Sequence, residues 1–340
     1  MSLMNNSTFI LSIIIPVYNV ENYIRECLDS LLQQDLTAYE VLCVNDGSTD
    51  GSLAILQEYQ AAHPDIFRVF TQTNQGQAAA RNKALDEAKG EFVVFLDSDD
   101  YYLPNAVVTI MNNILKYPHV DVFYWDCAVT TEGNRYYTLP HISPVEQQIK
   151  EYYDWEYDQY TTTPAGCVCG GAYRKAFLDK NHLRMRPGVY YEDELFIYSI
   201  FTCRGNVLAL HLNQPFYYYR TGRDGSTMTS LREKNFRDRM TVTREMNNIL
   251  QQSQFITEAR RHKIFSMYLQ NIIEGYQHGF IALITKMLKK EDIAIMAAGA
   301  MSQHEKKLLR LLKISPRLMA AYKTNQLPSL IRRFINIFVK

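Results

Sequence analysis

Between residues 11 and 129, short apolar runs rich in β-branched residues alternate with segments whose apolar residues recur at helical spacing. The apolar runs are bounded by polar or turn-forming residues, which predicts five strands, at 11–17, 41–44, 67–71, 92–96 and 120–129. The intervening segments predict helices, among them 77–88 and one that follows Pro104, a residue suited to a first helical position. Such alternation predicts a mainly parallel sheet with helices on both faces.

Three predicted strands end in polar loops, at Asp46, Asn74 and Asp97. Proteins built on parallel sheets bind ligands beyond the carboxyl ends of their strands. The sequence therefore predicts a ligand site at this edge of the sheet.

The carboxylate-rich loop is Asp97-Ser98-Asp99-Asp100. In extended backbone, residues two apart face the same way, so Asp97 and Asp99 can converge. Converging carboxylates repel each other unless a cation compensates, and Mg²⁺ takes one or two of them beside phosphate oxygens. The alternative is a solvated turn that caps the next helix.

The Asp46 carboxylate only accepts hydrogen bonds, so it can receive the imide N–H of uracil, which cytosine lacks. Guanine also offers N–H donors, so Asp46 restricts the choice of nucleotide base without identifying it. The alternative is that Asp46 and Asp50 cap the next helix, which is the role expected for Asp50.

Lys plus Arg and Asp plus Glu number 36 each, and this balance argues against nucleic-acid binding. Six cysteines, no basic N-terminal leader and no long apolar run favour a reduced, cytoplasmic protein. The segment Cys167-Val168-Cys169 suggests a metal site, but zinc needs four ligands and no second cysteine or histidine pair completes the set. Buried thiols in a strand are therefore expected there.

Five motifs occur in order, and together they resemble family 2 glycosyltransferases, which have the GT-A fold. They are Ile15-Pro16-Val17-Tyr18-Asn19, Asn45-Asp46-Gly47-Ser48-Thr49-Asp50, Asn74-Gln75-Gly76, Ala80-Arg81-Asn82 and Phe95-Leu96-Asp97-Ser98-Asp99-Asp100. The resemblance covers about residues 11–102. It implies an α/β fold of GT-A type, a mainly parallel sheet flanked by helices. The helical pattern from Ser230 onward predicts an α-helical C-terminal region.

The resemblance also implies site residues. Pro16, Tyr18 and Asp46 would line the nucleoside pocket. Asp97 would contact ribose, and Asp99, beside Asp97, would bind the Mg²⁺ or Mn²⁺ that holds the diphosphate.

Two arginines are implied near the donor, each with a structural alternative. Arg81 matches the family's donor position, or else lies on a helix surface in an ion pair. Arg220, in a late Tyr-Arg…Ser element that ends at Ser226, would neutralise the leaving diphosphate, or else form a surface ion pair.

Residues 187–196 resemble the family's Glu-Asp segment, in which the aspartate is the base. An acceptor hydroxyl must lose its proton as it attacks, which makes Asp193 the candidate base and Glu192 the reserve. The alternative is an acidic first helical turn, which the helix dipole would favour. The aromatic stretch at 152–160 would either stack on sugars or simply pack.

These features predict an inverting glycosyltransferase that moves one sugar from a nucleoside diphosphate, UDP being favoured, to a saccharide or lipid-linked acceptor, in synthesis of cell-surface polysaccharide or glycolipid. Neither Trp125 nor Trp155 forms the Gln-x-x-Arg-Trp element of processive relatives. A sugar nucleotidyltransferase is disfavoured because the first strand lacks a Gly-rich loop with a basic residue. A non-catalytic sugar-nucleotide or glycan-binding module is the second alternative, and it predicts a broken carboxylate set.

The expected organisation is an N-terminal extension at 1–10, a catalytic domain at 11–228 and a helical region at 229–340. The catalytic domain divides into a nucleotide-sugar half, 11–102, and an acceptor half, 103–228. The basic, amphipathic stretch at 330–339 predicts either a peripheral contact with the inner face of the plasma membrane or a helix packed on the protein.

Overall fold

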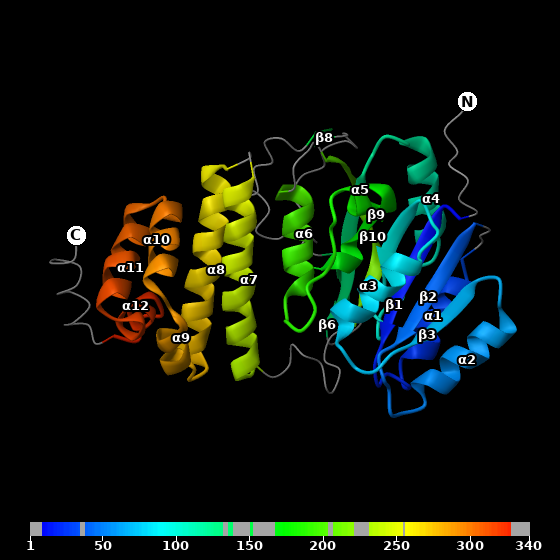
Figure 1. The fold of residues 1–340 in the computed structure, drawn as a ribbon, viewed down its shortest axis with the longest axis horizontal. Coiled ribbons are helices and arrows are strands. Elements are labelled where there is room, and N and C mark those ends of the chain that lie inside the picture. The colour runs from blue at the N-terminus through cyan, green and yellow to red at the C-terminus, as the bar shows by residue number, and fades with distance from the viewer. Residues whose placement is uncertain are drawn as a thin grey trace. The chain divides into compact units, whose positions relative to one another are not determined.

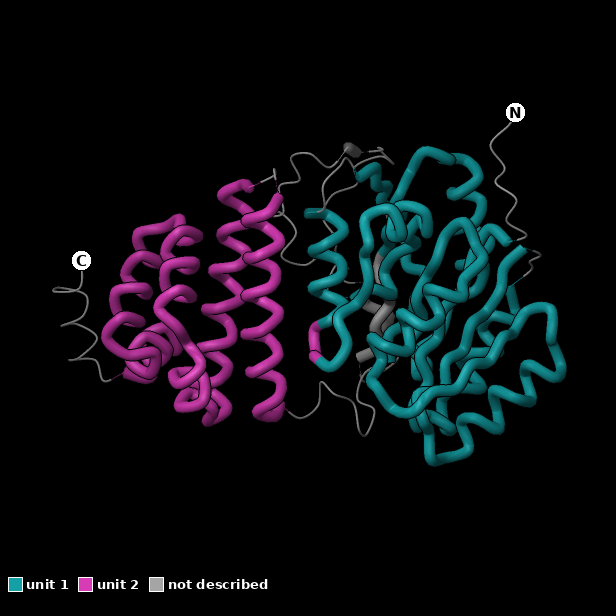
Figure 2. Tube along the Cα trace, viewed as in Figure 1, with its two compact units in different colours: residues 1–154, 162–188, 192–223 teal, residues 155–161, 189–191, 224–340 magenta. Residues whose placement is uncertain are grey.

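The structure is a computed structural model that describes residues 9–34, 38–131, 135–138, 150–151, 167–202, 207–220, 231–253 and 256–327. The chain divides into two compact units, each treated by itself below (Figure 2). Unit 1 comprises Met1–Asp154, Thr162–Gly188 and Glu192–Arg223. Unit 2 comprises Trp155–Thr161, Val189–Tyr191 and Asp224–Lys340.

Unit 1 contains one mixed sheet with the strand order β3-β2-β1-β4-β9-β6-β10-β5, in which β7 also pairs with β6 and β8 with β10 (Figure 1). The strands are β1 (Leu11–Val17), β2 (Tyr39–Asn45), β3 (Phe67–Thr71), β4 (Phe92–Phe95), β5 (Tyr101–Tyr102), β6 (Val122–Thr131), β7 (Arg135–Thr138), β8 (Lys150–Glu151), β9 (Gly171–Arg174) and β10 (Leu208–Tyr219).

The sheet is mostly parallel, as the sequence predicts. β1 pairs in parallel with β2 and β4, β2 with β3, and β6 with β10. β9 runs antiparallel to both β4 and β6, and so joins the two parallel parts. All seven residues of β1 and of β2 are buried, as strands covered on both faces require.

The helices of unit 1 are α1 (Ile24–Leu32), α2 (Ser52–Ala62), α3 (Gln77–Glu87), α4 (Ala106–Lys116), α5 (Lys175–Lys180) and α6 (Glu192–Thr202). Pro104 does not occupy the first position of α4, because the helix begins two residues later, after a left-handed Asn105 with a φ of 61°. The strand expected at Cys167-Val168-Cys169 is also wrong, since Val168–Gly170 forms a 3₁₀ turn and β9 begins at Gly171.

Unit 2 is helical, with α7 (Glu233–Gln252), α8 (Glu258–Gln277), α9 (Ile281–Met287), α10 (Lys290–Gly299), α11 (Gln303–Ile314) and α12 (Pro316–Lys323). Gly299 allows α10 to approach α8 closely, because a Cβ there would lie 2.3 Å from the carbonyl oxygen of Arg261. Within the described part of the chain, every helix is too short or too polar to cross a membrane. The amphipathic stretch at 330–339 and the aromatic stretch at 152–160 lie outside the described residues.

Candidate active site

The loops that follow β2 and β3 meet at the buried side chain of Asp46. Its Oδ1 accepts hydrogen bonds from the Gln72 side chain at 2.8 Å and from the backbone N–H of Gln75 at 2.9 Å. Its Oδ2 accepts from the backbone N–H of Gly76 at 2.8 Å. A carboxylate offers about four acceptor positions, so Asp46 shapes this loop and still has capacity for one more donor.

The end of β1 lies beside these loops. Pro16 is buried within β1, whereas Tyr18, just beyond the strand, is 47% exposed. Asn19 then holds the loop after β2, because its Oδ1 accepts the backbone N–H of Thr49 at 2.8 Å. The exposed Tyr18 ring thus stands at the carboxyl edge of the sheet, where a planar base could stack on it.

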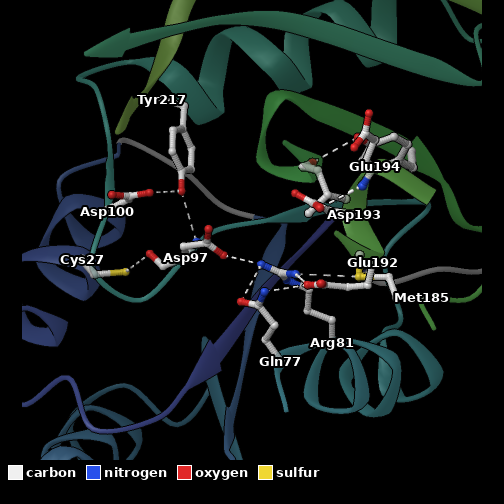
Figure 3. A network of polar contacts seen from close by, with 12 residues as sticks. Cys27, Gln77, Arg81, Asp97, Asp100, Met185, Glu192, Asp193, Glu194 and Tyr217 are labelled. Atoms are coloured by element: carbon white, nitrogen blue, oxygen red, sulfur yellow. Dashed lines mark hydrogen bonds and ion pairs between the residues drawn. The ribbon is translucent and has the colours of Figure 1, made fainter. Parts of the chain in front are cut away.

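Arg81 is the hub of the site, and Figure 3 shows its contacts. α3 carries it, and its side chain is only 3% exposed. Its Nη2 lies 2.6 Å from Asp97 Oδ1, and its Nη1 lies 2.9 Å from Glu192 Oε1. Arg81 is therefore not on a helix surface. It is a buried cation that connects the loop after β4 to the start of α6.

The carboxylate-rich loop after β4 brings three aspartates close together. Asp100 is buried and accepts hydrogen bonds from the Tyr217 hydroxyl and from the backbone N–H of Arg220. Burial, and then the charges of Asp97 and Asp99, raise the pKa of Asp100 to about 8. Carboxylate oxygens gathered in this way suit a hard divalent cation, so this loop fits the expected metal.

Arg220 lies against the same loop. Its Nε donates to the backbone carbonyl of Asp99 at 2.9 Å, and its Nη2 forms an ion pair with Glu26 at 2.5 Å. The guanidinium also stands 5.3 Å from the centre of the Tyr23 ring. The predicted ion pair therefore exists, and it holds Arg220 beside Asp99.

Glu192 and Asp193 open α6 and differ sharply in their surroundings. Glu192 is 1% exposed, and its Oε1 accepts from both Arg81 and the Gln77 side chain, the latter at 2.6 Å. Asp193 is only partly buried, and its Oδ1 accepts the backbone N–H of Glu194 at 2.8 Å. Burial, followed by the charge of Glu192, raises the pKa of Asp193 to about 8. Of the two carboxyl groups, Asp193 is thus the more exposed.

The site includes groups that the sequence pattern did not single out. Gln77 precedes Arg81 by four residues on α3, a spacing that places both on one helix face and that could have identified it. Asp100 belongs to the carboxylate-rich loop, and its partner Tyr217 to the Tyr-Arg element. The approach of Cys167 and Cys169 to Asp97 carried no sequence signal.

A mostly parallel sheet with carboxylates and an arginine hub beyond its strand ends defines an α/β protein of the GT-A class. Residues 12–181 match glycosyl transferase family 2, and the chain belongs to this family. It is 32% identical over 193 residues to an uncharacterized glycosyltransferase, YibD, of Escherichia coli, with 56% of each chain covered. The chain spans less than two thirds of the length of this and other curated relatives that it matches.

Two solved structures share the fold. Residues 1–349 of Staphylococcus aureus TarS, in complex with UDP-GlcNAc, match with a TM-score of 0.71 and 23% identity, covering 93% of this chain and 92% of that one. The Pyrobaculum calidifontis mannosyltransferase PcManGT, in complex with GDP-mannose and Mn²⁺, matches with a TM-score of 0.53 and 18% identity, covering 92% and 86%. At these identities the likeness concerns the fold.

Proposed function

We propose that this chain is an inverting glycosyltransferase that moves one sugar from a UDP-sugar to an acceptor hydroxyl, in synthesis of cell-surface polysaccharide or glycolipid. The observation that carries the proposal is the Arg81 bridge, which joins the carboxylate loop after β4 to the Glu192–Asp193 pair. One side chain thereby connects the expected donor-binding group to Glu192, the neighbour of the expected base Asp193. The proposed catalytic domain is residues 11–228, with the donor bound by 11–102 and the acceptor by 103–228.

The proposed donor pocket places the base against Tyr18 and Pro16, with Asp46 accepting the imide N–H and Asp97 contacting the ribose. Asp46 keeps one acceptor position beyond its three loop contacts, which supports this assignment. The structural neighbours bind a UDP-sugar in one case and a GDP-sugar in the other, so the fold admits both nucleotides. Asp46 is consistent with any base that offers an N–H donor, so the preference for uridine stays a proposal for the donor screen to test.

The proposed cofactor is Mg²⁺ or Mn²⁺, held by Asp99 with Asp97. When bound, such an ion supplies positive charge that stabilises the departing diphosphate. Arg220, whose Nε donates to the Asp99 carbonyl, is proposed to add to that positive charge.

In the proposed mechanism Asp193 removes the acceptor proton as the hydroxyl attacks the anomeric carbon. Direct displacement from the face opposite the nucleotide inverts the configuration at that carbon. Glu192 is proposed to hold Arg81 in place instead of acting as the base. Its Oε1 already accepts hydrogen bonds from Arg81 and Gln77, which both belong to the site. A raised pKa keeps Asp193 basic enough to accept a proton near neutral pH.

A donor screen tests the proposal. Thermal shift and donor hydrolysis would be measured with UDP-, GDP- and TDP-sugars, each with Mg²⁺ or Mn²⁺. We expect stabilisation and slow hydrolysis with a UDP-sugar and little effect from the others. Stabilisation by a UDP-sugar without hydrolysis or transfer to any acceptor would favour the non-catalytic binding module instead. No response to any nucleotide would contradict both.

We also propose that the basic stretch at 330–339 attaches the protein to an anionic membrane face, where a lipid-linked acceptor would be found. Co-sedimentation with anionic liposomes, comparing the full chain with one that ends at Asn325, tests this. We expect only the full chain to pellet at physiological salt. Equal pelleting of both, or of neither, would leave the stretch as a packing element.

A further inference from the structure

Three ligand-type side chains of unit 1 converge beside Arg81. One ligand atom from each of Asp97, Cys167 and Cys169 lies within 4.8 Å of the other two. Among the described residues, this is the one group of three or more such side chains found close enough to share a metal ion. In the sequence, no second cysteine or histidine pair completes a metal site with Cys167 and Cys169. In the folded protein, Asp97 supplies a third ligand.

The sheet explains why these residues meet. β4 and β9 pair antiparallel, with Val94 opposite Ala172. This antiparallel pairing brings the loop that follows β4, with Asp97, to the same end of the pair as the turn that precedes β9, with Cys169. Cys167 is extended and leads into the 3₁₀ turn that contains Cys169, so the tight turn keeps the two thiols together. Cys169 is buried, whereas Cys167 and Asp97 remain partly exposed, so two of the three ligands are accessible to solvent.

We propose that Asp97, Cys167 and Cys169 bind a thiophilic divalent cation of the zinc class. Thiolate ligands select zinc over Mg²⁺, and three protein ligands leave a fourth tetrahedral position for water. With Zn–S bonds of about 2.3 Å, two sulfurs on a tetrahedral ion lie roughly 3.8 Å apart, so small side-chain rotations complete the site.

Charge and orientation support the same assignment. The charge of Zn²⁺ would balance the two thiolates, while Asp97 shares the Arg81 guanidinium with Glu192. Arg81 holds Asp97 Oδ1 at 2.6 Å, which orients the carboxylate as an outer-shell partner of a metal ligand does. This site differs from the proposed diphosphate metal site because it uses sulfur ligands and needs neither nucleotide nor Asp99. Since both sites use Asp97, zinc is expected to compete with the donor.

The test uses the full chain, reduced and stripped of metal, with no nucleotide present. Zn²⁺ is titrated against a chromophoric chelator in excess Mg²⁺, and Cd²⁺ is titrated while thiolate-to-metal charge-transfer absorption is recorded. We expect one ion per chain and a thiolate band with Cd²⁺. Cys167→Ser, at a partly exposed position, should weaken zinc binding by at least roughly 10–100-fold and reduce the band.

Two control variants distinguish binding at these three ligands from zinc binding elsewhere on the protein. Cys43→Ala removes a buried thiol of β2 and should leave zinc binding unchanged. Asp99→Asn should also leave it unchanged, whereas Asp97→Asn should weaken it and keep the thiolate band. Zinc binding that survives in Cys167→Ser, or that is lost in Asp99→Asn, would overturn the proposal, as would the absence of a thiolate band in the wild type. None of these outcomes depends on glycosyl transfer.

Discussion

Each unit contains a partly or fully buried arginine paired with carboxylates, but the two clusters are built differently. In unit 2, Arg244 binds both oxygens of Asp292, at 2.9 and 2.7 Å, and donates to the Met287 carbonyl. Asp292 also accepts from the Tyr268 hydroxyl at 2.7 Å. In unit 1, Arg81 instead divides its two Nη atoms between different carboxylates, Asp97 and Glu192.

The pKa shifts show what this difference means. Burial opposes ionisation of Asp292, yet hydrogen bonds from Arg244 and its other partners hold the pKa of Asp292 below its ordinary value. In unit 1, burial and neighbouring carboxylates raise the pKa values of Asp100 and Asp193 to about 8. The cluster of unit 2 is charge-balanced and stabilises the fold. The cluster of unit 1 keeps surplus carboxylates, as functional sites do.

The largest effect expected is on turnover, from a change in the unit 1 cluster. Asp193→Asn should lower kcat by about 10²–10⁴-fold and leave donor affinity near wild type, because a base acts on the acceptor. Steady-state kinetics and calorimetry with UDP would measure the two quantities. Glu194→Gln, one residue along the same helix, is the matched control and should keep most of the turnover. An Asp193→Asn variant with nearly full kcat would assign the base elsewhere.

Removal of the metal should give the next largest effect. Because carboxylates repel a diphosphate unless a cation lies between them, UDP affinity should fall at least about tenfold in EDTA. Asp99→Ala should cause a similar loss with Mg²⁺ or Mn²⁺ present. Calorimetry measures both. Undiminished UDP binding under either condition would remove the metal from the proposed site.

Substitutions in the two clusters should change the free energy of unfolding in different ways. Asp292→Asn should destabilise the protein by about 2 kcal/mol, because it weakens a buried ion pair and leaves Arg244 without its partner charge. Asp100→Asn should instead be stabilising, more so at pH 9 than at pH 7, since the folded chain disfavours the Asp100 charge that the unfolded chain carries at both pH values. Urea denaturation at both pH values provides the measurement. Equal losses from the two substitutions would contradict the comparison.

The sign of each pH dependence follows from the direction of its pKa shift. Asp292 has a lowered pKa when folded, so its contribution is present above its unfolded pKa and is lost as the pH falls through the folded value. Asp100 has a raised pKa, so its contribution is fully present below its unfolded pKa and is lost as the pH rises from there through the folded value of about 8.

The smallest effect expected is a displacement of the pH profile. Asp193 must be ionised to act as a base, so kcat/KM of wild type should rise with pH through an apparent pKa near 8. Glu192→Gln removes the neighbouring charge that helps to raise this pKa, so the rising limb should move to lower pH. The measured quantity is the apparent pKa at which kcat/KM rises, and the maximum value of kcat/KM does not enter the test. If the apparent pKa does not change in Glu192→Gln, the ionisation belongs to a group other than Asp193.

Much of unit 1 was predictable because its signals are local. The bounds of β1 and β3 agree with the sequence prediction residue for residue, since an apolar run between polar residues marks a buried strand. The start of α4 could not be predicted in this way, because Asn105 takes a left-handed conformation and the helix begins after it, not at Pro104. The strand expected around Cys169 failed for a related reason: a short apolar run does not distinguish a strand from a tight turn.

The sequence by itself determined the α/β class, the order of the polar loops and the family, because periodicity and ordered motifs are properties of neighbouring residues. Only the tertiary structure decided which side chains of the site contact one another. Arg81 reaches Asp97 across 16 positions and Glu192 across 111, and the approach of Cys167 and Cys169 to Asp97 depends on β9 lying next to β4. Such contacts follow from strand order and burial, which bring distant charges together and which no local pattern encodes.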